Sequence, residues 1–322
     1  MIKIKLKCIL QSIPSAVLLF IAIGILFAMT SPYFLSLINL KNILLQSSPL
    51  AILSLGMSFV MLTNGIDLSV GSVVSFISIM TGKLLGMGFN IILSIFIGIL
   101  AGSVIGIFNG IIISKVKLPP FIVTLGTMGV SASLALVLCG GETLYWEKNW
   151  FNAIALKYFL SIPVTFWIVL LIFGFILWVV HKSSFGIYVY GIGSNEEALR
   201  LCGVKVNFYK AIVYLINGCF AGIVGIIITS RIASGNPIIG IGFEFEAIAA
   251  AAIGGISFVG GKGHPGFVLL SAVTITMLKN GLGLLGFGMA WQYCAIGIIL
   301  IIGMSINRLL EKIALTKRYL MI

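Results

Sequence analysis

The feature that most constrains this chain is a series of apolar stretches separated by short polar segments. A helix needs about 20 apolar residues to cross the hydrocarbon of a bilayer, and several stretches have that length. Soluble domains carry about 25% charged residues to cover their surface. This chain is 60% apolar and only 9% charged, so it has too few charges for a soluble globule. We therefore expect an all-α membrane protein that crosses the bilayer many times.

The apolar stretches predict about ten transmembrane helices within one membrane domain that fills residues 1–322. Helix ends are the least certain part of such a prediction, by about 2–4 residues. The predicted spans are 14–36, 45–63, 67–87, 89–114, 119–140, 159–180, 208–230, 243–258, 265–287 and 289–308.

The basic residues predict how these spans are oriented. Cytoplasmic loops carry an excess of Lys and Arg. With the amino terminus in the cytoplasm, fourteen of the 20 basic residues fall on the cytoplasmic side and six on the outer side. We therefore expect both termini inside. The net charge of +12 is spread over the ends of the apolar spans, which argues against a nucleic-acid partner.

Glycines repeat at helical spacing in the fourth span, at Gly98, Gly102, Gly106 and Gly110. Small residues four apart lie on one helix face and allow a neighbouring backbone to approach closely. We expect this face to be a helix-packing surface.

Two polar stretches interrupt the apolar pattern, TNGIDLSVGS at 63–72 and GFEFEAIAAAAIGG at 242–255. Each opens the second span of a group of four, and the two groups, spans 2–5 and 7–10, have opposite orientation in the predicted threading. Inverted repeats with interrupted helices near the solute path are an architecture of transporters.

The polar stretches supply the candidates for a translocation path, namely Asn64, Asp67, Ser69, Glu244 and Glu246. Asp67 is the only aspartate, and a carboxylate at membrane depth is costly unless it has a function or a partner. The alternative is that Asp67 is the N-cap of the third span. For the two glutamates, the alternative is ordinary acids at a helix start on the outer surface.

Motifs of catalysis and of metal or nucleotide binding are missing from the sequence. There is no HExxH or GxSxG, and GGISFVGGKGHPG fails the spacing of a phosphate loop. His181 and His264 lie far apart in the sequence, and we expect no metal partner near either. We therefore expect no enzyme activity, no cofactor and no metal site.

The most hydrophilic internal segment, 181–210, is cytoplasmic in the predicted threading, and we interpret it as a coupling loop. Within it, SNEEALRLCG predicts one short helix, with Ser194 or Asn195 as its cap and Gly203 as its end. Such a projecting helix needs a surface to pack on, and a second cytoplasmic protein would provide it. The residues of this predicted coupling helix are Gly193, Ser194, Asn195, Glu196, Glu197, Ala198, Arg200, Leu201 and Gly203.

Four blocks of sequence resemble one transporter family over nearly the whole chain. They are NILLQSSPLAILSLGMSFVMLTNGIDLSVGSVVSF (42–76), LPPFIVTLGTM (118–128), FGIYVYGIGSNEEALRLCGVKV (185–206) and FEFEAIAAAAIGGISFVGGKG (243–263). They resemble the membrane permease subunit of bacterial ABC importers for simple sugars, the ribose, xylose and galactose permease family.

The resemblance implies a protein of the bacterial cytoplasmic membrane with several partners. These are an ABC ATPase subunit at the cytoplasmic face, an extracytoplasmic sugar-binding protein and a second permease copy. It also implies that the helix at 194–203 docks on the ATPase. Related permeases carry autoinducer-2 or nucleosides, and these solutes stay open. A secondary transporter also remains an alternative; it would use buried acids such as Asp67 and would leave the projecting helix without a role.

Overall fold

The computed structural model describes residues 15–147 and 150–319, and for residues 306–319 it describes the backbone alone. The start of the first predicted span and several basic residues used to orient the spans, Lys148 among them, lie outside the described residues.

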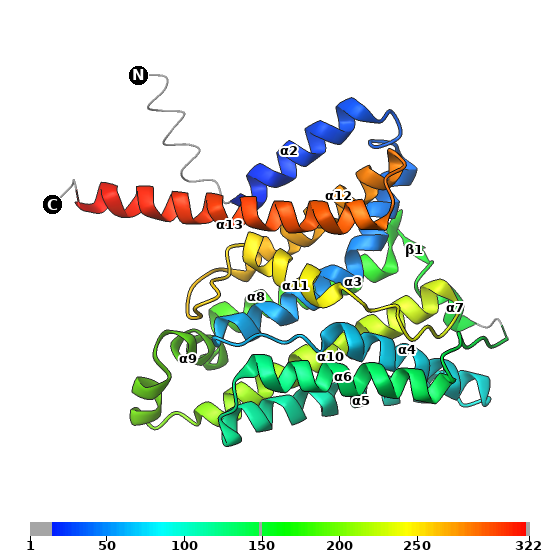
Figure 1. Ribbon diagram of the computed structural model, residues 1–322, viewed down its shortest axis with the longest axis horizontal. Helices are drawn as coiled ribbons and strands as arrows, with labels where there is room; N and C mark the ends of the chain where they lie inside the picture. Colours follow the sequence, from blue (N-terminus) through cyan, green and yellow to red (C-terminus); the bar gives the residue numbers. More distant parts are fainter. Residues whose placement is uncertain (1–14, 148–149, 320–322) are drawn as a thin grey trace.

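The described chain is almost entirely helical (Figure 1). Its one small sheet pairs β1 with β2 in antiparallel register. The elements in chain order are α2 (Ser15–Thr30), α3 (Leu37–Leu62), α4 (Val70–Gly86), α5 (Ile91–Ile111), the π-helix η1 (Ile112–Val116), α6 (Pro120–Cys139), α7 (Trp150–Ile154), β1 (Tyr158–Phe159), β2 (Ile162–Pro163), α8 (Val164–Lys182), α9 (Ser184–Leu201), α10 (Val206–Ile232), α11 (Phe243–Ile253), the 3-10 helix η2 (Pro265–Phe267), α12 (Val268–Leu284) and α13 (Met289–Tyr319).

Six helical segments among the described residues are long and apolar enough to cross a membrane: 37–62, 91–116, 120–139, 164–182, 206–232 and 265–284. The helices at 15–30, 70–86 and 289–305 are apolar but shorter. The fold is therefore that of an α-helical membrane protein, whereas the number of ten spans and their orientation stay predictions.

The helix α3 lies at the centre and is longer than its predicted span of 45–63. It begins at Leu37 because the Ser36 side chain accepts the Asn39 N–H as a cap. Asn39 is polar yet buried, and it exchanges two hydrogen bonds with Asn280 of α12. This buried polar pair attaches the first turns of α3 to α12.

The helices α5 and α10 pack together along the four glycines of the fourth predicted span. A Cβ added at Gly102 would lie 2.5 Å from the Gly218 carbonyl oxygen and 3.0 Å from the Gly222 Cα. The glycines of both helices therefore allow the two backbones to touch, without intervening side chains.

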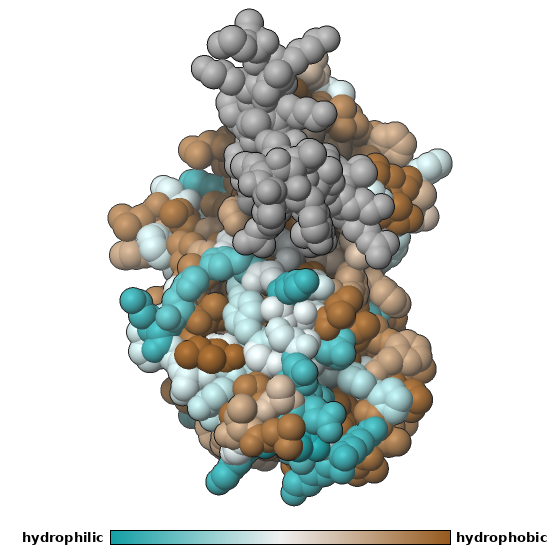
Figure 2. All heavy atoms as spheres, turned by 90° about the vertical axis from the view of Figure 1, so that its left-hand side faces the viewer, coloured by the Kyte–Doolittle hydropathy of each residue, from teal (hydrophilic) through white to brown (hydrophobic). Residues whose placement is uncertain are grey.

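The bundle has two different ends. In Figure 1, α9 and the last turns of α13 lie at the left, while α7 and the turn between α4 and α5 lie at the right. Figure 2 looks onto the left-hand end, where hydrophilic side chains gather, with hydrophobic side chains on the flanks. This distribution is typical of a membrane protein with a polar surface at the end of the bundle.

Candidate functional site

The first polar interruption is a non-helical stretch, residues 63–69, between α3 and α4. Asn64 takes a positive φ of 59°, a conformation that Asn tolerates better than most residues. Asp67 follows it and is 1% exposed. Ser69, not Asp67, is the residue that precedes the first turn of α4. The prediction of Asp67 as the N-cap was therefore wrong by two positions, and Asp67 instead shapes the turn before the helix.

Asp67 is held only by neutral donors. Its Oδ1 accepts the Ser69 N–H at 2.9 Å and the Ser69 hydroxyl at 2.6 Å. Its Oδ2 accepts the Asn217 side-chain amide of α10 at 2.9 Å. The described residues give it no ion pair. The carboxylate thus joins the interrupted stretch to α10 in a buried polar network.

Two further helices join this network through side chains that the sequence analysis did not select. Asn109 of α5 donates to the Ser69 hydroxyl at 3.1 Å, and Thr127 of α6 donates to Asn109 at 2.5 Å. The signal was present, because Asn109 and Asn217 each stand before a glycine inside an otherwise apolar span. Polar side chains inside membrane spans usually bond to a neighbouring helix.

The second polar interruption begins earlier than predicted, as a non-helical stretch at 233–242 that is largely made of turns. Gly235 pairs with the backbone of Leu144 at the α7 end. From there the stretch runs along α4 toward the first turn of that helix. The Asn236 N–H donates to the Ser78 hydroxyl at 3.2 Å, and the Gly240 N–H donates to the Ser75 hydroxyl at 2.9 Å. Non-helical backbone at membrane depth occurs where it is buried in protein or lines a cavity.

The two interruptions meet in the middle of the bundle. A Cβ at Gly240 would collide with the Gly71 carbonyl oxygen in the first turn of α4. The stretch at 63–69 starts from the α9 end, and the stretch at 233–242 starts from the α7 end, as the non-helical segments in Figure 1 show. α11 then supplies only an 11-residue helix instead of the predicted 243–258.

The two glutamates of α11 are buried on different sides of its first turn. The Glu244 carboxylate accepts the Gly242 N–H at 3.2 Å and lies against Gly71 of α4. The Glu246 carboxylate accepts the Lys279 ammonium group of α12 at 2.7 Å. They are 5% and 3% exposed, so the alternative interpretation of both as surface acids was wrong.

The predicted short helix is the second half of α9. The helix bends at Asn195, which has an extended backbone (φ −159°, ψ 95°) and accepts the Ala198 N–H at 3.0 Å. Gly203 has a φ of 82° just beyond its end. Of the two expected caps, Asn195 caps the helix, and Ser194 belongs to the preceding turns. The surrounding segment is not a loop, because α9 is already helical from Ser184.

Ion pairs fix one side of this short helix and leave the other exposed. Glu196 pairs with Arg200 at 2.8 Å and with Lys210 of α10 at 2.6 Å. Glu197 is exposed, and Leu201 is 85% exposed. The helix therefore presents an acidic and apolar face that no described residue covers.

A glycine junction, defined as Gly193, Gly260 and Gly261, connects α9 to the first interruption and to the loop after α11. The Gly261 N–H donates to the Leu62 carbonyl at the end of α3 at 2.9 Å. A Cβ at Gly260 would lie 2.9 Å from the backbone nitrogen of Asn64, and one at Gly193 would collide with Leu62 and Gly261. The end of α3, the bend of α9 and the loop after α11 are thus in direct backbone contact.

The two histidines are neighbours, contrary to the expectation from their sequence positions. The Nε2 atoms of His181 and His264 are 2.8 Å apart. The Gly266 N–H donates to Nδ1 of His264, so in its neutral form His264 carries its proton on Nε2 and donates to His181. No group of three metal-ligating side chains lies among the described residues.

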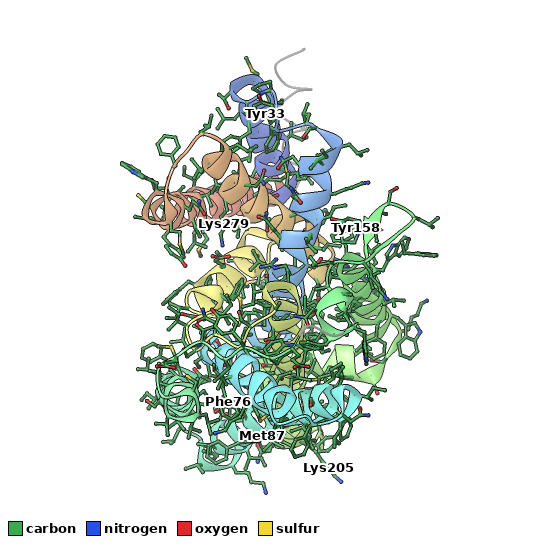
Figure 3. All side chains as sticks on the ribbon, turned by 90° about the vertical axis from the view of Figure 1, so that its right-hand side faces the viewer. Tyr33, Phe76, Met87, Tyr158, Lys205 and Lys279 are labelled. Carbon is green, nitrogen blue, oxygen red and sulfur yellow. The ribbon has the colours of Figure 1, made fainter. Side chains whose placement is uncertain are left out.

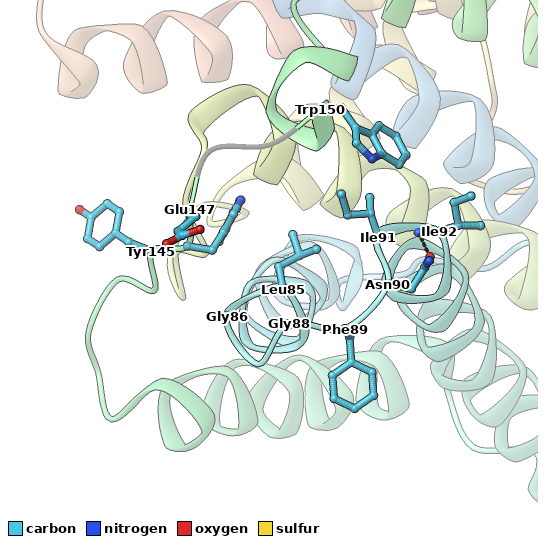
Figure 4. A pocket seen from close by; sticks show the side chains of 11 residues that line it. Leu85, Gly86, Gly88, Phe89, Asn90, Ile91, Ile92, Tyr145, Glu147 and Trp150 are labelled. Atoms are coloured by element: carbon cyan, nitrogen blue, oxygen red, sulfur yellow. Dashed lines mark hydrogen bonds between the residues drawn. The ribbon is translucent and has the colours of Figure 1, made fainter.

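A wide hollow lies at the end of the bundle opposite to α9 (Figure 4). It has a volume of about 1000 Å³, and Leu85, Phe89, Asn90, Tyr145 and Trp150 are part of its lining. It is wide and open, and it includes none of the predicted path residues. It is therefore a surface feature of the α7 end rather than part of a path.

A comparison with protein families matches residues 39–304 to the family described as branched-chain amino acid transport system / permease component. The chain is 36% identical to the ribose import permease protein RbsC of Haemophilus influenzae, over 88% of this chain and 90% of that protein. It is 37% identical to RbsC of Bacillus subtilis, over 95% of both chains. It is 33% identical to the D-allose transport system permease protein AlsC of Escherichia coli, over 92% and 91%. No solved structure matches significantly.

Proposed function

We propose that this chain, which belongs to the family of branched-chain amino acid transport system permease components, is the membrane subunit of an ATP-driven importer of a simple sugar. The relatives named as ribose and D-allose permeases cover most of the chain at 33–37% identity. Such a subunit carries out no chemistry. It moves solute by binding it differently in two conformations.

The short helix at the end of α9 is the observation that carries the ATP-driven part of this proposal. It stands at the hydrophilic end of the bundle, capped at both ends, with Glu197 and Leu201 exposed. A secondary transporter has no partner for such a helix. We assign it to the ATPase subunit, so that this end is cytoplasmic and the chain lies in the bacterial cytoplasmic membrane.

The glycine junction provides the route from the ATPase to the path. Movement of α9 acts on Leu62 and Asn64 at one interruption and on the loop that follows α11. The stretch with Asn64, Asp67 and Ser69 and the stretch ending at Glu244 then change their contact at Gly71 and Gly240. This contact is the gate in our proposal, and its opening alternates access between the two ends.

Two other partners complete the importer. An extracytoplasmic sugar-binding protein delivers the solute at the α7 end, and a second permease copy forms the other half of the path. The exposed apolar flanks of α5, α6 and α8 face lipid or this second copy.

Reconstitution into liposomes tests the function. We expect uptake of D-ribose, D-allose or L-arabinose that requires the ATPase subunit, ATP and the binding protein. Uptake driven by an ion gradient without the ATPase would contradict the proposal.

A charge reversal tests the docking helix. Glu197→Arg reverses an exposed charge on the docking face, and we expect it to lower uptake about tenfold while the protein still folds. Co-purification of the ATPase subunit with the permease is the second readout, and Glu142→Arg is its matched control, because Glu142 is an exposed acid at the opposite end from α9. Equal ATPase binding by the two variants would exclude the docking role of Glu197.

A further inference from the structure

A second, smaller cavity lies inside the bundle between α3, α10, α11 and α12. Its volume is about 290 Å³, at the lower end of the range in which proteins hold small ligands, roughly 300–1,000 Å³. Residues from all four helices line it, among them Gln46, Arg231, Phe243, Glu246, Thr276 and Lys279. The cavity therefore has the size for a small solute and a polar lining within an apolar bundle.

The charges around this cavity are only partly satisfied. Lys279 pairs with Oε1 of Glu246 at 2.7 Å and lies 6.0 Å from the centre of the Phe243 ring. Figure 3 shows Lys279 between the C-terminal helices and α11. Arg231, at the end of α10, makes no hydrogen bond or ion pair with any residue that the structure describes. A half-buried guanidinium group without a partner is costly, which favours a ligand with oxygen acceptors.

The arrangement matches the chemistry of a sugar. Arg231 and Lys279 donate to hydroxyl oxygens, the remaining oxygen of Glu246 accepts from hydroxyl hydrogens, and Phe243 offers a ring against C–H groups. The Glu246–Lys279 pair neutralises itself, so one positive charge is left over. A sugar hydroxyl can accept from Arg231 while another donates to the Glu246 carboxylate, whereas an anion would meet that carboxylate as a like charge.

We propose that this cavity is a solute-binding station of the permease itself, at which Arg231 and Glu246 bind a neutral polyhydroxylated solute on its way through the bundle. This inference rests on the proposed function, and it assigns part of the solute selectivity to the permease rather than to the delivering protein alone. Glu246 was a predicted path residue, whereas Arg231 and Lys279 were classed from the sequence only as outer-side charges.

Direct binding tests the station. The permease–ATPase complex is placed in lipid nanodiscs without any sugar-binding protein, and saturation-transfer NMR is recorded with D-ribose, D-allose and L-arabinose. We expect transfer to at least one of these sugars, and we expect Arg231→Met and Glu246→Gln to weaken that binding about tenfold, as for loss of a hydrogen bond to a charged group. Lys157→Met, which removes an exposed positive charge from the segment between α7 and β1, is the matched control and should bind as the unmodified chain does.

The outcomes separate this inference from the proposed function. The Arg231→Met substitution leaves no other charged group unpaired, so this variant should fold even if the Glu246→Gln variant does not. Gel filtration checks the folding of both variants. Absence of transfer in the unmodified complex overturns the station, and so does binding by both variants that is as strong as in the unmodified complex; in either case ATP-driven uptake in liposomes still supports the importer. Stronger binding of ribose 5-phosphate than of the neutral sugars would contradict the proposal that the cavity binds a neutral solute. Failure of uptake by the unmodified importer overturns the proposed function instead.

Discussion

The contact between α5 and α10 makes a quantitative prediction at Gly106. A Cβ at this position would collide with the Tyr214 carbonyl oxygen and lie 3.0 Å from the Cα of Gly218. Both are backbone atoms, so no side-chain rotation relieves the overlap, and the two helices must separate. Overpacking of this kind costs about 1–3 kcal/mol. Alanine also gains about 1 kcal/mol over glycine in helix propensity, so Gly106→Ala should lose about 0–2 kcal/mol net.

A second helical glycine, Gly126, serves as a control that cancels the gain in helix propensity from glycine to alanine. Gly126 lies in α6, and a Cβ there would meet nothing within 4 Å. Gly126→Ala therefore gains the propensity without the collision, and the difference between the two variants equals the packing cost, about 1–3 kcal/mol. The assay is unfolding of both purified variants in the same detergent, followed by intrinsic fluorescence. Equal midpoints would refute the close approach of α5 and α10, and Gly106→Val should extend the loss.

Two further predictions follow from buried or paired polar groups. Asn217→Leu leaves one oxygen of Asp67 without its donor and should cost about 1–3 kcal/mol in the same unfolding assay; a smaller loss in the Asp67→Asn background would confirm the coupling, and strict additivity would exclude it. Burial, and then the neighbouring His181, lower the pKa of His264 from the ordinary value of 6.5. The unfolded chain then binds a proton at His264 more readily than the folded chain does. The contribution of neutral His264 to the free energy of unfolding is therefore fully present above pH 6.5, and it is lost as the pH falls toward the lower pKa of the folded state. His264→Gln should flatten this part of the pH–stability curve, and an unchanged slope would contradict the role of the pair.

Local patterns in the sequence predicted the long apolar helices and the end signals of the short helix at the end of α9, because these depend on neighbouring residues. Asn195 caps the first turn after the bend and Gly203 follows the last, as the SNEEALRLCG pattern indicates. Apolar length alone also indicated the long helices at 91–116 and 206–232.

Local sequence patterns could not predict the contacts between segments that are far apart in the chain. The non-helical stretch at 233–242 is held against α4 by the hydroxyls of Ser75 and Ser78, which accept its N–H groups, and no local signal records those partners. The pairing of His181 with His264 depends on how α8 meets the start of α12, which lies 83 residues away in the sequence. The burial of Glu246 similarly depends on Lys279, which supplies the opposite charge from another helix.

The glycine junction makes the α9 end of the bundle rigid. Three segments that are far apart in the chain touch there through backbone atoms, which cannot change rotamer to absorb a small displacement. A shift of α9 by a fraction of an ångström must therefore be passed on or resisted, and it reaches the end of α3 and the loop after α11 at the same moment. We therefore expect the end of α3 and the loop after α11 to move together with α9 instead of in sequence.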